Sequence, residues 1–284
     1  MLRTRELLIL ICLQVLFLGS SAQATEPELL VATTTSVQDS GLLDALLPLF
    51  KERTGIHVRP VAVGSGAALR MGAEGNVDLL ITHDPKGEEG ILASGAVVSR
   101  HPFMENYFVI AGPAEDPAMV AGAPSAAEAF GRMAKAKAPY VSRGDDSGTH
   151  RREAALLEEA GLDPKGRWEG LERTGASMGL TLQVAGERRA YVLSDIGTFL
   201  AFQKRIDLVV LSRPEPALRN VYSVLRVNPE RFPGRIHEES ARALEAFLLG
   251  QEAQKIIAEF GKERFGKSLF LPLLLDSARK SADG

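Results

Sequence analysis

The stretch that organises this chain is Ser142-Arg143-Gly144-Asp145-Asp146-Ser147-Gly148-Thr149-His150. It follows a short apolar run, residues 139–141, and precedes residues 151–160, which have a helical pattern. The stretch is therefore a predicted turn from a strand into a helix. A helix N-terminus carries unpaired N–H groups and a partial positive charge, to which this turn adds hydroxyl groups and a guanidinium. We interpret it as a candidate anion site, although an ordinary capped helix, with Arg143 paired to a neighbouring carboxylate, would use the same residues.

Two further turns are rich in hydroxyl groups and glycine. Thr33-Thr34-Thr35-Ser36-Val37-Gln38-Asp39-Ser40-Gly41 follows a predicted strand, 28–32, and precedes a helix that begins near Gly41. Its four consecutive hydroxyls exceed the single one that a helix cap needs. Gly64-Ser65-Gly66 follows the predicted strand 57–63. Because ligands of α/β proteins bind at the carboxyl ends of the strands, these turns predict a shared ligand in the crevice there.

The first part of the chain alternates strand and helix patterns. Residues 42–50 place leucines and Phe50 on one helical face, and Pro48 within this helix is expected to kink or split it. Residues 77–82 form a continuous apolar run, which is typical of a buried parallel strand. The resulting βαβαβ order predicts a parallel sheet with right-handed crossovers.

The alternation continues from about residue 113 to the C-terminus. We predict an α/β protein of two lobes, joined by two chain crossings near Gly112 and Val221. The first lobe would comprise residues 25–110 together with 222–284, and the second lobe residues 111–221. The expected later elements are helices over 125–137, 147–160, 178–186, 237–249 and 251–260, and strands over 107–111, 139–141, 189–194, 207–211 and 222–227.

Residues 1–24 have the features of a secretory signal peptide. A basic start with Arg3 and Arg5 is followed by the apolar run 7–18 and by the small-residue site Ala22-Gln23-Ala24. The apolar run is too short for a spanning helix. The single cysteine, Cys12, lies in this segment, so the mature protein is expected to have no thiol and no disulfide. We therefore predict a secreted, periplasmic protein.

Composition excludes some classes of partner and site. The chain of 284 residues is 45% hydrophobic and 24% charged, as expected for a soluble globular protein. Its net charge of −3 would become −4 on loss of the signal peptide, so no polybasic surface and no nucleic-acid partner are expected. The five histidines have no metal-ligand spacing. We interpret His83-Asp84 as a hydrogen-bonded strand end near the lobe interface.

The sequence favours binding over catalysis. Asp146, Ser147 and His150 are close in sequence, but the turn is not Gly-x-Ser-x-Gly, and His150 at i+3 on the same helix would reach the serine hydroxyl poorly. Gly64-Ser65-Gly66 lacks the following residues of a nucleotide loop. A secreted hydrolase or phosphatase remains the alternative from a different functional class.

The order of these motifs resembles the tungstate-binding component of bacterial ABC importers. The similarity runs from about Leu29 to the C-terminus, and its C-terminal part resembles many periplasmic binding proteins. It departs from the family pattern at Ser177, where a glycine is expected. The motifs that carry the resemblance are Thr33 to Ser36 with Asp39 to Leu43, Val61 to Gly66, His83-Asp84-Pro85, Asn106 to Pro113 and Ser142 to His150.

The resemblance implies a two-lobed type II periplasmic-binding-protein fold, with parallel-rich sheets and a ligand cleft between the lobes. It implies capture of tungstate for a membrane permease, with no catalytic residues, no cofactor and no free metal cation, in a protein expected to be a monomer. The oxyanion-binding residues that we predict are Thr34, Thr35, Ser36, Ser65, Arg143, Ser147, Thr149 and Ser177.

The residue types suit a desolvated tetrahedral dianion, whose oxygens must each meet a donor. Hydroxyls and helix N–H groups are preorganised neutral donors, and Arg143 adds charge and directed N–H groups. By themselves these residues leave tungstate, molybdate, sulfate and phosphate open. Phosphate retains protons and needs a carboxylate acceptor, whereas tungstate would be repelled by one. We therefore expect Asp145 and Asp146 to point away from the anion.

Overall fold

The computed structural model describes residues 28–275, so the predicted signal peptide lies outside the described residues. The strands form a ten-stranded sheet in the order β2-β1-β3-β9-β4-β7-β5-β6, and both β8 and β10 pair with β4. Their bounds are β1 (Glu28–Thr34), β2 (His57–Val63), β3 (Leu79–Thr82), β4 (Val97–Gly112), β5 (Tyr140–Ser142), β6 (Leu171–Arg173), β7 (Tyr191–Asp195), β8 (Val209–Val210), β9 (Arg219–Val227) and β10 (Leu271–Pro272).

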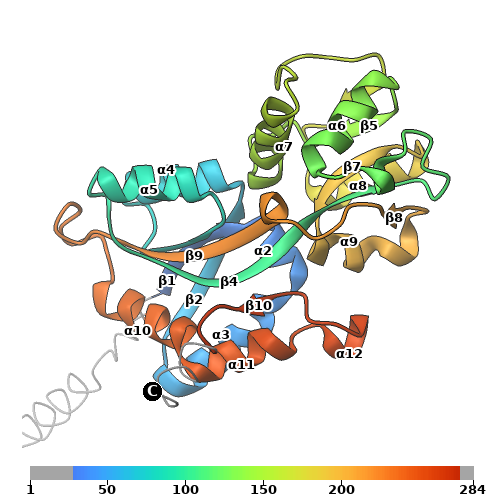
Figure 1. Ribbon diagram of the computed structural model, residues 1–284. Coiled ribbons are helices and arrows are strands. Elements are labelled where there is room, and N and C mark those ends of the chain that lie inside the picture. Colours follow the sequence, from blue (N-terminus) through green and yellow to red (C-terminus); the bar gives the residue numbers. More distant parts are fainter. Residues whose placement is uncertain (1–27, 276–284) are drawn as a thin grey trace, which may run out of the picture.

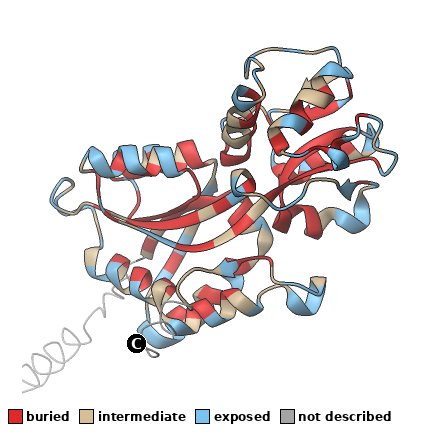
Figure 2. Cartoon of the chain, in the orientation of Figure 1, coloured by how far each residue is buried: buried red, intermediate tan, exposed pale blue. Residues whose placement is uncertain are grey.

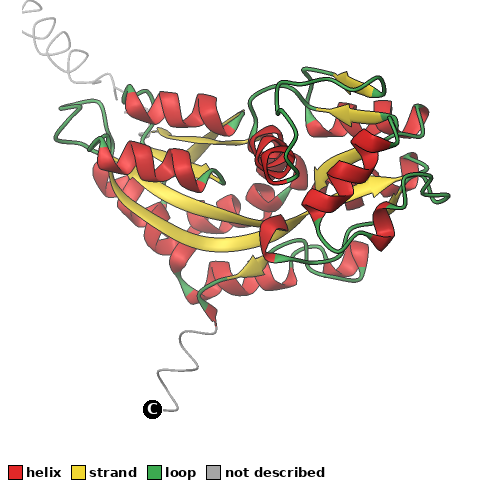
Figure 3. Ribbon diagram, turned by 45° about the horizontal axis from the view of Figure 1, so that its top comes forward, coloured by secondary structure: helices red, strands yellow, loops and turns green. Residues whose placement is uncertain are grey.

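The helices lie on both faces of this sheet, which confirms the predicted α/β class (Figure 3). Their bounds are α2 (Thr35–Ser40), α3 (Leu42–Thr54), α4 (Ser65–Ala73), α5 (Pro85–Ala93), α6 (Ala126–Lys135), α7 (Gly148–Glu159), α8 (Met178–Glu187), α9 (Ile196–Phe202), α10 (Glu238–Leu249), α11 (Gln251–Glu259) and α12 (Lys262–Phe265).

Parallel pairing occurs at the two ends of the sheet. β1 is parallel to β2 and to β3, as the βαβαβ pattern predicts, and β5 is parallel to β6 and β7. Between these two groups, β9 is antiparallel to β3 and β4, and β4 is antiparallel to β7. The carboxyl ends of β1, β2 and β3 therefore lie at one edge, which is where two of the three hydroxyl-rich turns begin.

The long strands β4 and β9 connect two parts of the molecule (Figure 1). Residues 97–107 of β4 pair with β9, whereas residues 108–112 pair with β7 and β8. We call β1, β2, β3, β9 and the start of β4, with their helices, the first half. The second half comprises β5, β6, β7, β8 and the end of β4, with α6, α7, α8 and α9.

Buried side chains follow the strands and the inner faces of the helices (Figure 2). In the first half, α4 and α5 cover one sheet face, and α3, α10 and α11 cover the other (Figure 1). One apolar cluster continues from the first half into the second, where it includes Met178, Leu182 and Phe199. A separate cluster around Phe130 and Tyr140 packs α6 and α7 on the sheet of the second half.

The structure departs from the sequence analysis at three places. Pro48 does not split its helix, because α3 runs unbroken from Leu42 to Thr54. A proline inside a helix costs about 3 kcal/mol, which the burial of several large side chains of α3 can offset. Residues 35–40, expected to be a loop, form α2, and residues 196–202, to which no element was assigned, form α9.

Candidate anion-binding site

The guanidinium of Arg143 is buried, with only 5% of the residue exposed, directly after β5. Its Nη2 donates to Asp145 Oδ2 at 2.6 Å, and its Nε donates to the carbonyl oxygen of Ala176 at 3.3 Å. Asp145 Oδ1 also accepts the N–H of Ser147 at 3.2 Å. Asp145 therefore orients Arg143 and closes the turn on itself, as expected for a carboxylate that does not face an anion.

The helix α7 begins as the sequence predicts. Ser147 is its N-cap, and Ser147 Oγ accepts the N–H of His150 at 3.3 Å. The imidazole of His150 is turned elsewhere, since its Nδ1 accepts the N–H of Asp146 at 3.0 Å. Thr149 is buried in the first turn of the helix. The geometry of a serine activated by a histidine base is thus not formed by these residues.

A buried carboxylate that sequence reasoning missed holds this turn from behind. Glu153 accepts hydrogen bonds from Tyr140 Oη at 2.7 Å and from Ser142 Oγ at 2.6 Å. Burial raises the pKa of the Glu153 carboxyl, and the bonds from Ser142 and Tyr140 oppose that rise. The side chain ties α7 to β5 and thereby fixes the strand and the helix that flank Arg143.

The hydroxyl-rich stretch after β1 contributes two buried, mutually bonded groups. Thr34 Oγ1 and Ser36 Oγ lie 3.1 Å apart, and both residues are buried. Thr35 is partly exposed as the first residue of α2. Within the described residues, Thr34 forms no side-chain cap for this helix. The first N–H groups of α2 are therefore left for another acceptor.

Two other hydroxyls of this edge are fully buried and have no hydrogen-bond partner among residues 28–275. These are Ser65 Oγ, at the start of α4, and Thr33 Oγ1, near the end of β1. Buried hydroxyls without partners are costly, and a bound ligand or water is a usual explanation for them. Gly64, the N-cap of α4, has no side chain with which to cap that helix.

The turns approach one another across the two halves. A Cβ atom built on Gly64 would lie 3.8 Å from Ser147 Cα. One built on Gly148 would lie 2.3 Å from Cε1 of His83. The positive charge of Arg143 acts to lower the pKa values of Asp39 in α2, of His83 after β3 and of the buried Asp195 in β7. Arg143 is thus central to the region where the predicted turns meet.

The predicted residue Ser177 occupies a different environment. It is exposed at the N-cap of α8 and forms no cap hydrogen bond in the part of the chain that the structure describes. The neighbouring Ala176 nevertheless supplies the carbonyl that receives Arg143 Nε. Ser177 therefore lies at the rim, while the seven other predicted residues lie on the three turns, six of them buried and Thr35 partly exposed.

The sequence analysis also missed a polar network between the paired strands β4 and β9, near the boundary of the two halves. Asn106 and Asn220 face each other in register, and Asn220 Nδ2 donates to Asn106 Oδ1 at 2.8 Å and to Tyr222 Oη at 2.9 Å. Burial raises the pKa of the Tyr222 hydroxyl, while hydrogen bonding with Ser36 opposes the rise. Period-two alternation along β9 places Asn220 and Tyr222 on one face, but it does not show which residues that face meets.

His83 lies at a strand end on the boundary between the two halves, as expected, but its Nδ1 is buried without a hydrogen-bond partner among residues 28–275, contrary to the expected hydrogen-bonded state. It follows β3, is buried, and packs its ring 4.8 Å from that of Tyr222 and 6.2 Å from that of Phe108. Burial lowers the pKa of His83 to about 4, so its imidazole is neutral at pH 7. Within this region the fixed positive charge therefore comes from arginine.

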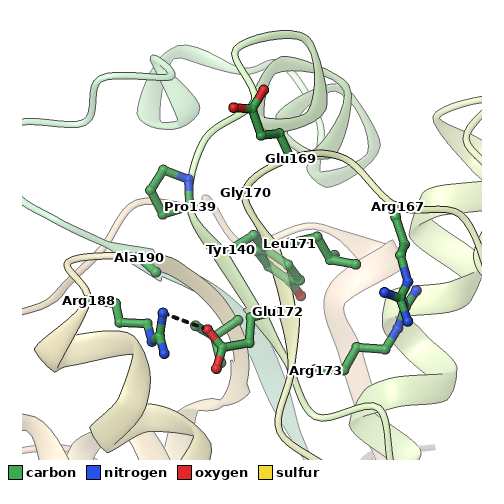
Figure 4. A pocket seen from close by; sticks show the side chains of 11 residues that line it. Pro139, Tyr140, Arg167, Glu169, Gly170, Leu171, Glu172, Arg173, Arg188 and Ala190 are labelled. Atoms are coloured by element: carbon green, nitrogen blue, oxygen red, sulfur yellow. Dashed lines mark ion pairs between the residues drawn. The ribbon is translucent and has the colours of Figure 1, made fainter.

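A cavity of about 670 Å³ lies elsewhere, at the outer edge of β6 (Figure 4). Its charged lining includes Arg167, Arg173 and the ion pair of Arg188 with Glu172, at 2.9 Å. None of the predicted anion-binding residues lines it. Its ion-paired, exposed walls make it a poorer candidate for a desolvated anion than the turns around Arg143.

Residues 28–275 show neither a metal-binding cluster nor a membrane-spanning helix. No cluster of histidine, cysteine, aspartate and glutamate in that range could hold a metal ion. No helix there combines the length and apolarity needed to cross a membrane.

Comparisons with known proteins point to one group. A family model described as a PBP superfamily domain matches residues 20–252. The tungstate-binding protein TupA of Peptoclostridium acidaminophilum is 40% identical over 246 residues, 86% of this chain and 85% of its own length. The structure of the tungstate ABC transporter from Geobacter sulfurreducens is 44% identical with a TM-score of 0.74, covering 83% of this chain and 99% of its own. TupA from Desulfovibrio alaskensis G20 is 37% identical with a TM-score of 0.74, covering 87% and 99%.

Proposed function

This chain belongs to the PBP superfamily, and from that premise we propose that it is the extracytoplasmic solute-binding protein of an ABC importer whose ligand is tungstate. Relatives and solved structures named for tungstate binding or transport match more than four fifths of the chain. The observation that carries the proposal is a buried arginine, Arg143, whose charge acts on Asp39 of the first turn and whose own turn is approached by Gly64 of the third turn. The protein is a binding protein and not an enzyme in this proposal.

The proposed ligand site combines neutral donors with one permanent positive charge. The hydroxyls of Ser36 and Ser65 and the N-terminal N–H groups of α4 and α7 would face the anion from opposite halves. Arg143 would supply directed, charge-assisted N–H groups, because its guanidinium remains protonated and is already held by Asp145. The unpartnered Oγ of Ser65 supports this assignment, since a bound oxygen would satisfy it.

The carboxylates of the turn support tungstate over phosphate. Asp145 is engaged by Arg143 and by the N–H of Ser147, and Asp146 pairs with Arg151 at 3.1 Å. Neither is thereby left as a free acceptor for a protonated oxyanion. Molybdate, which has the same charge and shape, remains the nearest alternative ligand, and the relatives named above favour tungstate.

Binding is proposed to close the two halves on each other. The proposed lobes are residues 25–110 with 222–284 and residues 111–221, with the hinge near Gly112 and Val221, where β4 ends and β9 begins. A ligand held from both lobes couples its capture to a change of shape, which a membrane permease can recognise. The protein would act as a monomer in the periplasm after removal of residues 1–24, and it would need no cofactor.

The decisive experiment is a thermal-shift panel on protein stripped of bound anion. Tungstate, molybdate, sulfate and phosphate are compared at equal micromolar concentrations. At a thousandfold excess over Kd, tungstate should stabilise the protein by about 4 kcal/mol. No rise in melting temperature with tungstate would refute the assignment, and a larger rise with phosphate would identify a phosphate receptor. Turnover of generic esters and phosphate esters would instead support the hydrolase alternative.

A further inference from the structure

A charged contact joins the two halves outside the predicted anion site. Arg151 lies on α7, in the second half, and its Nη1 donates to Oδ2 of Asp84, which precedes α5 in the first half. Arg151 and Asp84 belong to different halves and lie 67 positions apart in the sequence, so their contact spans the boundary between the halves. Neither residue belongs to the hydroxyl-rich turns.

Both partners are oriented by their own half. Asp84 is the N-cap of α5, where its Oδ1 accepts the N–H of Gly87 at 3.2 Å. Arg151 is held on α7 by Asp146, whose two carboxylate oxygens each accept a hydrogen bond of 3.1 Å from the guanidinium. The side chain of Asp84 is only 10% exposed and that of Arg151 is 35% exposed. Little side-chain freedom is therefore lost when the two meet.

Two glycines, Gly66 and Gly148, leave room for the contact because neither has a side chain that would obstruct it. A Cβ atom on Gly66 would lie 2.4 Å from Arg151 Nη2, and one on Gly148 would meet the ring of His83. Beside the contact is a cavity of about 740 Å³ whose walls come from residues 83–87, from Phe108 and from residues of α7 that include Arg151 and Arg152. The contact between Arg151 and Asp84 thus lies at the border of an open space between α5 and α7.

We propose that Arg151 and Asp84 form a latch that sets how long the anion stays bound, without either residue touching it. The inference rests on the proposed function and on its closure of the two lobes. The latch forms only in the closed state, so it slows opening and release but contributes nothing to the rate of capture. Arg151 and Asp84 are therefore positioning residues for binding.

The expected size of the effect lies between two limits. Losing an exposed ion pair changes an equilibrium by up to about fivefold, whereas breaking a buried charge pair changes it by about thirtyfold or more. The latch is half-buried, and Asp84 retains its helix-capping hydrogen bond when Arg151 is removed. We therefore expect the dissociation rate of tungstate to rise about tenfold.

Stopped-flow association and dissociation of tungstate, with the full mature chain, test the latch. Arg151→Ala and Asp84→Asn are each compared with wild type and with the double variant; asparagine keeps the capping oxygen of Asp84. The matched control is Arg188→Ala, which removes an exposed arginine–glutamate pair lying wholly within the second half. Melting temperatures are measured with and without tungstate.

Each single variant should raise the dissociation rate about tenfold, and the double variant should add nothing further, because both remove the same contact. The association rate and the melting temperature without ligand should stay unchanged, and Arg188→Ala should behave as wild type. Unchanged dissociation, additive effects, or equal loss of stability with and without ligand would overturn the latch. Wild-type protein that does not bind tungstate at all would overturn the proposed function and the latch with it.

Discussion

Replacing Arg143 by alanine tests the centre of the proposed site. The guanidinium is 5% exposed and donates to Asp145 and to the carbonyl of Ala176. In the proposed site Arg143 is the one permanent positive charge beside the anion, so its loss would leave a desolvated dianion without a charged partner. Truncating one partner of a buried, hydrogen-bonded charge pair costs about 2–5 kcal/mol, which corresponds to a roughly 30- to 4,000-fold weaker affinity for tungstate.

Titration calorimetry on anion-stripped protein measures this loss directly. Arg143→Lys should recover only part of the affinity, because the planar fork that donates two directed N–H groups is absent. Arg188→Ala, in the exposed pair with Glu172, serves as the control and should change affinity by less than about threefold. Tungstate affinity of Arg143→Ala equal to that of wild type would show that Arg143 is only a partner of Asp145, and that the site has been misplaced.

Three further predictions follow from the same geometry. Gly148→Ala should weaken tungstate binding, because the new methyl group would overlap the ring of His83. It should also abolish the decrease in radius of gyration that tungstate causes, as measured by small-angle scattering. A decrease equal to that of wild type would contradict this prediction. In calorimetry, Asp146→Asn should change tungstate affinity by less than about threefold. Asp145→Asn should change it by up to about tenfold, because Arg143 would be held less firmly. The prediction is wrong if wild type binds phosphate more tightly than tungstate and Asp146→Asn loses phosphate binding. The folded-state pKa of His83, about 4, lies below its ordinary value of 6.5, so the unfolded chain binds the proton more readily. The free energy of unfolding should therefore decrease by about 3 kcal/mol as the pH drops from 6.5 to 4. Urea unfolding of His83→Gln should lack this part of the decrease.

Regular patterns allowed much of the fold to be predicted. The strand at 57–63 was predicted with its observed bounds, and the helix at 147–160 to within a residue at each end. The strand β4 was predicted only over 107–111, because Arg100, Pro102 and Glu105 interrupt the apolar alternation of its first part. That part is nevertheless a strand, since β9 pairs with it from Val97 to Tyr107. Pairing with a distant segment outweighed local sequence preference.

The candidate site also contains some residues that local sequence predicts and others that only distant contacts reveal. Arg143 and Ser147 could be named from one turn, because the chemistry of a hydroxyl-rich helix start is local. Their role in binding stays a prediction. Tyr222 and Asn220 were not named, since a polar residue in an apolar strand gives no sign of what it will face. The contact between Arg151 and Asp84 joins residues 67 positions apart, and no local rule selects that pair.

The sequence by itself determined the α/β alternation, the hydroxyl-rich turns at strand ends and the single arginine among them, because helix periodicity, strand alternation and helix capping act over a few residues. Only the tertiary structure decided which turns meet. Three features depend on how β4 and β9 run from one half into the other. They are the approach of Gly64 to Ser147, the burial of Arg143 near Asp39 and His83, and the contact between Arg151 and Asp84. That crossing is set by the packing of the whole apolar core, to which each residue contributes only a small part.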